Sequence, residues 1–366
     1  MFLLGWIIFS FFPPVLFAQE SEQSIPGVGE QYFQGEVVEI VNEGRREEAG
    51  FSNFFQELEV EIVNGSLKGE VVEVEHGGVV SVSPREEYRV GDKVVLIQFS
   101  KSGDVSYSIM DTYRLPALIS IIVGFFLLVI LVAGRRGIGS IVGLVISFLI
   151  IVKFIVPQIL DGRDPVLISV VGAIAIMAVT MYLAHSFSKK TTVAVVSTLI
   201  TLVITGVLSY FFVEVARLSG LGSEDSFLLQ FGPTHVNLKG LLLGGMIIGA
   251  LGVLDDITTS QTSTVVEISR ANQKLSVKEL FLRGSNVGRD HVASLVNTLV
   301  LAYAGASMAL FILFVVNPAE QPYWVILNSE AIGEEVVRTI AGSIGLVLAV
   351  PITTIAAAWY CRVIKK

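Results

Sequence analysis

The sequence predicts an all-α polytopic membrane helix bundle of about seven transmembrane helices, preceded by a small all-β domain. Of the 366 residues, 52% are hydrophobic and only 16% are charged, unlike a soluble globular chain. Seven runs beyond residue 115 are apolar and long enough to cross a hydrocarbon core. Residues 32–107 instead alternate polar and apolar side chains, as half-buried strands do.

Residues 1–18 are apolar and end at Ala18 before a polar stretch, which is typical of a signal peptide, or of an N-terminal anchor if uncleaved. Residues 19–115 are expected to form the extracytoplasmic domain. They hold 19 of the 33 acidic residues and 8 of the 25 basic ones, so the negative charge of the chain belongs to this domain. Turn pairs such as Asn64-Gly65 separate five or six short predicted strands, and an OB-like barrel is the favoured arrangement.

The β domain has two interpretations at this stage, a docking module and a folded cap on the helices. Its acidic surface excludes nucleic acid as an expected partner, because nucleic-acid binding requires cations that neutralise phosphates. The single cysteine, Cys361, cannot form an intrachain disulfide. We expect no cofactor.

The predicted transmembrane domain spans residues 116–366. Helices are expected because backbone groups in lipid must bond within their own segment. The seven runs are residues 116–133, 138–157, 166–185, 192–213, 238–254, 292–316 and 336–360. Lys and Arg gather at alternate connections, and this bias predicts a cytoplasmic loop at 255–291, a cytoplasmic C-terminus and an outside β domain.

Small residues and one proline mark predicted helix-packing positions. They are Gly244, Gly245, Gly249, Gly252, Gly305, Gly342, Gly345 and Pro351. Glycines at four-residue spacing allow a neighbouring helix to approach closely. The alternative interpretation is a narrow pathway, or a helix that slides during a conformational cycle.

Two polar motifs are candidates for a functional site. Asp255 and Asp256 follow the predicted end of the fifth run, where the helix dipole disfavours carboxylates, and Gln261 follows them. The structural alternative is that Asp256 caps a short following helix. A capping-box pattern, Ser276 to Glu279, predicts a second short helix in the same loop.

The second motif lies at the start of the sixth run. Asp290 and His291 precede it, and Asn297 lies within it, where a polar side chain needs a partner. Asp290 alone is also explained as an N-cap. If both motifs converge, they form an ion, proton or substrate site, and a metal held by Asp255, Asp256, Asp290 and His291 stays open.

Three stretches carry a resemblance to a known family: Gly249–Gln261, Gly288–Gly305 and Arg338–Pro351. In these the chain resembles the YibE/F family of bacterial multi-span membrane proteins, over residues 116–366. The resemblance implies a polytopic protein of the bacterial cytoplasmic membrane with a small extracytoplasmic domain. It supplies no reaction, substrate or catalytic residue.

The leading functional hypothesis is a permease or transport component of unknown substrate. The alternative is a non-transporting assembly or regulatory membrane protein that docks through its β domain. An interfacial membrane hydrolase comes third, because the sequence contains no G-x-S-x-G or Walker motif, and no catalytic residue is assigned. The expected partners are the lipid bilayer and either a second copy of the chain or another membrane protein.

Overall fold

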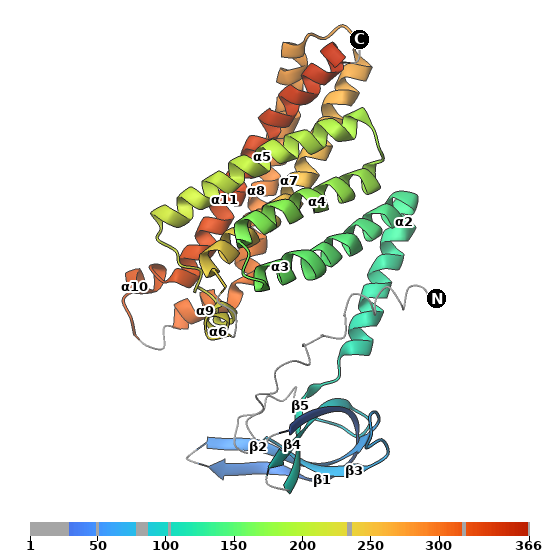
Figure 1. The fold of residues 1–366 in the computed structure, drawn as a ribbon, viewed down its shortest axis with the longest axis vertical. Helices are drawn as coiled ribbons and strands as arrows, with labels where there is room; N and C mark the ends of the chain where they lie inside the picture. Colours follow the sequence, from blue (N-terminus) through green and yellow to red (C-terminus); the bar gives the residue numbers. More distant parts are fainter. Residues whose placement is uncertain are drawn as a thin grey trace. The chain divides into compact units, whose positions relative to one another are not determined.

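The computed structural model describes residues 29–48, 51–77, 87–101, 104–232, 236–316 and 320–364. The chain divides into two compact units, Met1–Leu128 and Val129–Lys366 (Figure 1). The expected signal or anchor at residues 1–18 lies outside the described residues.

The first unit contains one antiparallel sheet with the strand order β3-β2-β1-β4-β5. The strands are β1 (Gly29–Glu48), β2 (Phe51–Ile62), β3 (Val71–Gly77), β4 (Lys93–Lys101) and β5 (Asp104–Thr112). The outermost strands β3 and β5 also approach each other, so the sheet curls into a half-barrel (Figure 1). The prediction of antiparallel strands is confirmed, but β1 with 20 residues and β2 with 12 are longer than the short strands expected.

Alternating side chains fill the half-barrel. Leu58, Val60 and Ile62 of β2 and Val94 and Leu96 of β4 are fully buried at period two, as expected for strands with one inner face. Burial of these aliphatic side chains stabilises each strand by about 1.5–3 kcal/mol per residue.

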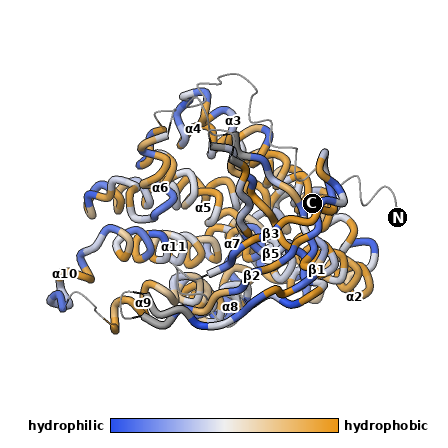
Figure 2. Tube along the Cα trace, turned by 90° about the horizontal axis from the view of Figure 1, so that it is seen from below, coloured by the Kyte–Doolittle hydropathy of each residue, from blue (hydrophilic) through white to orange (hydrophobic). Residues whose placement is uncertain are grey.

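The helices of the chain begin in the first unit and continue through the second. They are α2 (Leu115–Ile150), α3 (Val156–Leu160), α4 (Pro165–His185), α5 (Lys189–Val215), α6 (Glu224–Gln230), α7 (Leu238–Ala271), α8 (Val277–Ala306), α9 (Met308–Val316), α10 (Tyr323–Leu327) and α11 (Glu330–Trp359). Within the described residues, five helical stretches are long and apolar enough to cross a membrane, or six if the bent pair α8 and α9 forms one span. Figure 2 shows the hydrophobic colour along α2 and α9, whereas β1 is largely hydrophilic.

The first two predicted runs form a single helical stretch with one break. Leu115–Leu160 is helical throughout except at Gly134, whose φ of +57° and ψ of −134° are readily adopted only by glycine. A π-helical turn, Ile151–Ile155, links α2 to α3. The break at Gly134 falls in the predicted connection between residues 133 and 138.

The expectation that the helix of the fifth run ends near residue 254 is wrong, because α7 continues to Ala271. Ile257, Gln261 and Val265 are fully buried, so tertiary packing keeps the segment helical beyond its most apolar part. Asp255 and Asp256 therefore lie inside a helix, where Asp256 caps nothing and no helix-end dipole acts on them.

The expected helix start at Asp290 is also wrong. The Ser276–Glu279 capping box is confirmed, and it begins α8, which runs without interruption through Asp290 and His291 to Ala306. The chain then bends by 65° into α9. The predicted loop 255–291 is thus two long helical segments joined by a short turn.

Helix α7 occupies the centre of the bundle and packs against α4, α5, α8 and α11. Leu254 and Ile257 of α7 join Met177 of α4, Leu202 of α5 and Ala349 of α11 in the largest apolar core. This core surrounds the segment of α7 on which the candidate site is built.

Candidate functional site

Side-chain hydrogen bonds build the turn between α4 and α5. The Ser188 hydroxyl caps α5 by accepting from the Thr191 backbone N–H at 3.1 Å, and the Thr191 hydroxyl donates to the Ser186 carbonyl oxygen at 2.9 Å. These bonds hold Ser186 at a φ of +64°, which is uncommon outside glycine. The turn thereby fixes His185, the last residue of α4, and Lys190, in the first turn of α5.

Glycines bring the second half of α2 against α4. A Cβ built on Gly139 would lie 2.6 Å from the Leu183 carbonyl oxygen, and one on Gly143 would lie 3.5 Å from the Thr180 Cα. A side chain at Gly139 would force the two helices apart. Arg136 lies one turn before Gly139 and therefore reaches the end of the bundle that carries the α4–α5 turn.

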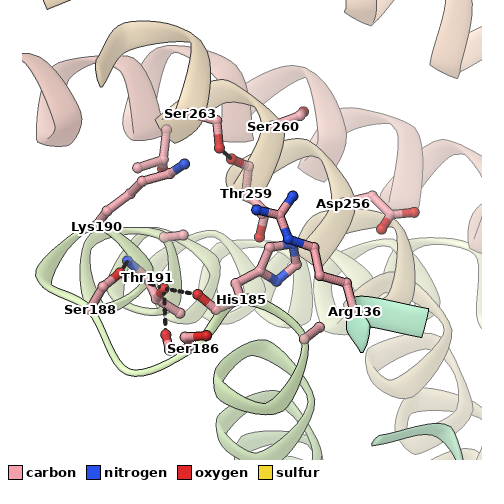
Figure 3. Close-up of a pocket in the computed structure, with 13 residues that line it drawn as sticks. Arg136, His185, Ser186, Ser188, Lys190, Thr191, Asp256, Thr259, Ser260 and Ser263 are labelled. Atoms are coloured by element: carbon pink, nitrogen blue, oxygen red, sulfur yellow. Dashed lines mark hydrogen bonds between the residues drawn. The ribbon is translucent and has the colours of Figure 1, made fainter. Parts of the chain in front are cut away.

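These elements and α7 enclose a polar cleft of about 530 Å³, which we call the basic cleft. Its lining residues are Arg136, Ala184, His185, Ser186, Ser188, Lys190, Thr191, Ala194, Asp256, Thr259, Ser260, Thr262 and Ser263. Figure 3 shows Arg136 and Lys190 entering it from different elements, with His185 between them in this view. Eight of the thirteen lining side chains are polar hydroxyl or imidazole groups, so the cleft suits a hydrogen-bonding solute.

The charged side chains of the basic cleft lie near one another but form no close ion pairs with described residues. His185 lies close enough to Lys190, Arg136 and Asp256 for each of them to influence its charge. Arg136, Lys190 and Asp256 form no hydrogen bond or close ion pair with any residue that the structure describes. Two unpaired cations therefore face a single carboxylate.

A buried hydroxyl on α7 forms the floor of the basic cleft. Thr262 is fully buried, and its Oγ1 has no hydrogen-bond partner among the described residues. One turn deeper, the hydroxyls of Thr258 on α7 and Thr198 on α5 lie 2.6 Å apart. Polar groups thus continue from the cleft into the α5–α7 interface.

A line of hydroxyls, which we call the α5 stripe, continues along that helix. It consists of Ser197, Thr201, Thr205 and Ser209, all fully buried. Their four-residue spacing places them on one helix face. The Thr201 and Thr205 hydroxyls donate to the carbonyl oxygens one turn earlier at 2.8 and 2.9 Å, whereas Ser209 Oγ has no partner in the described chain.

Helix α11 faces α5 with small residues at the same spacing. They are Ala341, Gly345, Ala349, Thr353 and Ala357, and all are buried. A Cβ on Gly345 would overlap the Thr205 side chain, so the two backbones approach closely here. The α5 stripe is therefore enclosed by α11, without bulky side chains between the two helices at this point.

Gln261 of α7 joins three helices. Its Nε2 donates to the Gly284 carbonyl oxygen of α8 at 2.8 Å and to the Thr354 hydroxyl of α11 at 2.7 Å. A Cβ on Gly288 would overlap the Val350 side chain of α11 and would lie 3.1 Å from the Gln261 amide, so α8 approaches both closely here. Gln261 Oε1 is buried without a partner among the described residues.

Of the predicted site residues other than Gln261, only Asp256 lines the basic cleft. Asp256 lines the basic cleft, whereas Asp255 accepts a hydrogen bond from Thr259 at 3.4 Å and does not line the cleft. Asp290, His291 and Asn297 of α8 do not line it either. Asp290 and Asn297 are exposed, and His291 is half-buried with an unpartnered Nδ1 among the described residues.

The described residues contain no group of three or more His, Cys, Asp and Glu side chains arranged to hold a metal ion. The four residues considered for a metal therefore do not form one such group. The chemistry of the basic cleft, with two cations and many hydroxyls, suits an anion rather than a cation.

The predicted packing glycines fall into three environments. A Cβ on Gly244 would overlap Ser169 of α4, as one on Gly345 would overlap Thr205. Gly249 and Gly342 have ordinary neighbours at 3.5 and 3.6 Å, Tyr303 and Leu299 respectively. For Gly245, Gly252 and Gly305, a Cβ would meet no described atom within 4 Å. Pro351 lies inside α11.

At the opposite end of the bundle, carboxylates of α11 hold the loop after α5. Glu330 accepts hydrogen bonds from the Ser219 hydroxyl at 2.7 Å and the Gly220 N–H at 2.8 Å, and Glu334 accepts from the Gly222 N–H at 2.9 Å. Gly220 has a φ of +90°, which suits glycine. This loop is thereby fastened to α11 at the end remote from the basic cleft.

The helical region matches the family model for YibE/F-like proteins over residues 121–363. This chain belongs to the YibE/F-like family. The resemblance inferred from the three sequence stretches is therefore confirmed, and the match begins after the β domain. Searches of the curated proteins and of the solved structures found no match to this chain.

Sequence reasoning missed most of the polar side chains that form the basic cleft and the α5 stripe of this YibE/F-like protein. Arg136 and Lys190 served only as orientation signals, and His185 only as the end of a run. The α5 stripe has a sequence signal, since Ser197, Thr201, Thr205 and Ser209 repeat every fourth residue within an apolar run. Helical spacing of hydroxyls would have indicated a polar interface.

Proposed function

We propose that this YibE/F-like protein is a permease of the bacterial cytoplasmic membrane, with the basic cleft as its cytoplasmic entrance. The α5 stripe forms part of its pathway. Support comes from one observation above all: α5, α7 and α11 pack against one another, and each carries buried polar atoms without a partner among the described residues.

Five such atoms lie on these three helices. They are Ser209 Oγ, Gln261 Oε1, Thr262 Oγ1, Ser343 Oγ and Thr353 Oγ1, and none has a partner among the described residues. Leaving a buried polar group unpaired costs about 1–3 kcal/mol. Because this cost has no return within the described chain, we infer that the polar groups serve a passing solute.

The transmembrane topology belongs to the same proposal. Leu115–Leu160 contains 46 residues, about 69 Å of helix at 1.5 Å per residue, which is twice the thickness of a hydrocarbon core. Two crossings that meet at Gly134, three crossings by α4, α5 and α7, one by α8 with α9 and one by α11 make seven. Arg135 and Arg136 beside the break then lie on the cytoplasmic side.

The half-barrel lies outside the cell in this proposal, after a signal peptide or anchor at residues 1–18. We regard it as OB-like, because β1 pairs with both β2 and β4 and the end strands β3 and β5 approach each other. The bilayer is the main partner, and a second copy or another membrane protein completes the proposed assembly.

Cysteine labelling tests the pathway. In a Cys361→Ser background, Thr201→Cys and Thr205→Cys are treated with a membrane-impermeant thiol reagent in right-side-out and inside-out vesicles. We expect both to react, because a polar pathway admits water to the α5 stripe. Val203→Cys, on the exposed apolar face of α5, is the matched control that should stay unreactive.

Two further positions calibrate this experiment and test the orientation. Ser188→Cys in the α4–α5 turn should react only in inside-out vesicles, and Ser223→Cys before α6 only in right-side-out ones. If Thr201→Cys and Thr205→Cys are as unreactive as Val203→Cys while Ser188→Cys reacts, the permease proposal fails and the assembly role becomes the better interpretation.

A further inference from the structure

The basic cleft offers cations that the described chain leaves unused. Arg136 and Lys190 come from α2 and α5, and neither forms a hydrogen bond or close ion pair with a described residue. Asp256, the only carboxylate of the lining, does not pair with them. Two cations held by separate helices around one cleft create a positive potential that attracts an anionic ligand.

Hydroxyl donors surround these cations. Ser186, Ser188, Ser260 and Ser263 line the cleft together with Thr259. A hydroxyl group can rotate to donate a hydrogen bond, so these side chains can bind oxyanions of different shapes. The lining therefore supplies both the charge and the directional donors that an oxyanion requires.

The floor of the cleft gives a second, independent indication of a ligand. Thr262 is fully buried and lines the cleft, but its Oγ1 has no partner among the described residues. A buried hydroxyl without a partner is costly, and a ligand oxygen at the floor would satisfy it. Thr262 lies one helical turn from Thr258, whose hydroxyl contacts that of Thr198 on α5.

The size of the cleft limits the ligand. Its volume of about 530 Å³ falls within the range of small-molecule sites. It exceeds the volume of one phosphate or carboxylate group, so the oxyanion is expected to be part of a larger polar molecule. Asp256 then faces the neutral or cationic part of that molecule, since it would repel the oxyanion itself.

We propose that the basic cleft binds the phosphate or carboxylate group of a small polar molecule between Arg136 and Lys190, with Thr262 donating a hydrogen bond from the floor. This inference rests on the proposed permease function, for which it names the substrate class. The same oxyanion chemistry occurs in soluble metabolites and in anionic lipid headgroups, and the test below separates these two sources.

The test measures thermal stabilisation of the full-length protein in a neutral detergent. The probes are inorganic phosphate, citrate and short-chain phosphatidylglycerol, each titrated at constant ionic strength. We expect saturable stabilisation by at least one probe, and Arg136→Gln and Lys190→Gln should each weaken the apparent affinity about tenfold, as loss of a charge-assisted hydrogen bond does.

The matched control is Arg135→Gln, which removes the neighbouring cation that does not line the cleft. It should bind the probes as the wild type does. Arg136→Lys keeps the charge but loses the planar fork of donors, so it should recover part of the affinity. Thr262→Val should weaken binding without changing its dependence on ionic strength.

Each outcome decides one question. Stabilisation by phosphate or citrate supports a soluble ligand, and stabilisation by phosphatidylglycerol alone supports a headgroup site. No saturable effect by any probe, or equal losses in Arg135→Gln and Arg136→Gln, overturns the inference. Binding that persists when Thr201→Cys and Thr205→Cys are inaccessible leaves the oxyanion site standing while the permease proposal fails.

Discussion

The hydroxyls of Thr198 and Thr258 lie 2.6 Å apart, fully buried between α5 and α7. They separate the floor of the basic cleft from the α5 stripe. They join the two helices through a direct polar contact between the cleft-lining face of α7 and α5.

The coupling between these two hydroxyls is measurable by a double-mutant cycle. Thr198→Val and Thr258→Val each remove one partner while keeping the shape of the side chain. We expect a coupling free energy of about 0.6 kcal/mol, the average for hydrogen bonds between membrane helices. Denaturation in mixed detergent micelles measures it, and strictly additive effects of the two substitutions would show that the contact contributes no stability.

The close approach of α5 and α11 predicts a strong effect at Gly345. Because a Cβ there would overlap Thr205, Gly345→Val should lower the free energy of unfolding by about 1–3 kcal/mol through overpacking. Gly245→Val, where a Cβ meets no described atom within 4 Å, should change it by less than about 0.5 kcal/mol. Fluorescence-detected size-exclusion chromatography after heating compares both, and equal melting of the two variants would contradict the packing.

Replacing Gln261 by leucine should destabilise the protein, although hydrophobicity alone would not predict this loss. Gln261→Leu removes the donor to the Gly284 carbonyl oxygen and the Thr354 hydroxyl, so we expect a loss of about 1–3 kcal/mol. Gln273→Leu is the control, since Gln273 is exposed in the turn after α7. Unchanged unfolding of Gln261→Leu would mean that burying the leucine offsets both lost hydrogen bonds.

Glu330 is expected to keep the loop after α5 in its folded conformation. Glu330→Ala removes the acceptor for Ser219 and Gly220, so trypsin should cleave after Arg217 several-fold faster in the purified protein. Glu320→Ala, in an exposed position, should leave the cleavage rate unchanged. Fragment mass spectrometry identifies the cut, and an unchanged rate in Glu330→Ala would show that other contacts hold the loop.

Several parts of the fold could be predicted because their signals are local. The period-two pattern that buries Leu58 and Val60 predicted strands, and long apolar runs predicted the helices that the structure contains. The Ser276–Glu279 capping box needed only four consecutive residues. The family was recognised for the same reason, since its motifs are contiguous stretches of the chain.

The candidate site could be predicted only in part, because it depends on which helices meet. Asp256 and Gln261 were singled out by sequence, but the reason given for Asp256, a helix end, was wrong. The residues that accompany Asp256, namely Arg136, His185 and Lys190, come from three other elements, and nothing in their local sequence links them.

An alternating β domain followed by apolar helices of the YibE/F-like family could thus be predicted without the structure, because hydropathy and its period are properties of neighbouring residues. Three features depend on how the helices pack: α7 continues to Ala271, Asp256 but not His291 lines the basic cleft, and hydroxyls line the α5–α11 contact. Packing explains all three: burial of Ile257 and Val265 outweighs the weak helix preference of their segment, and the close approach at Gly345 sets which side chains face each other.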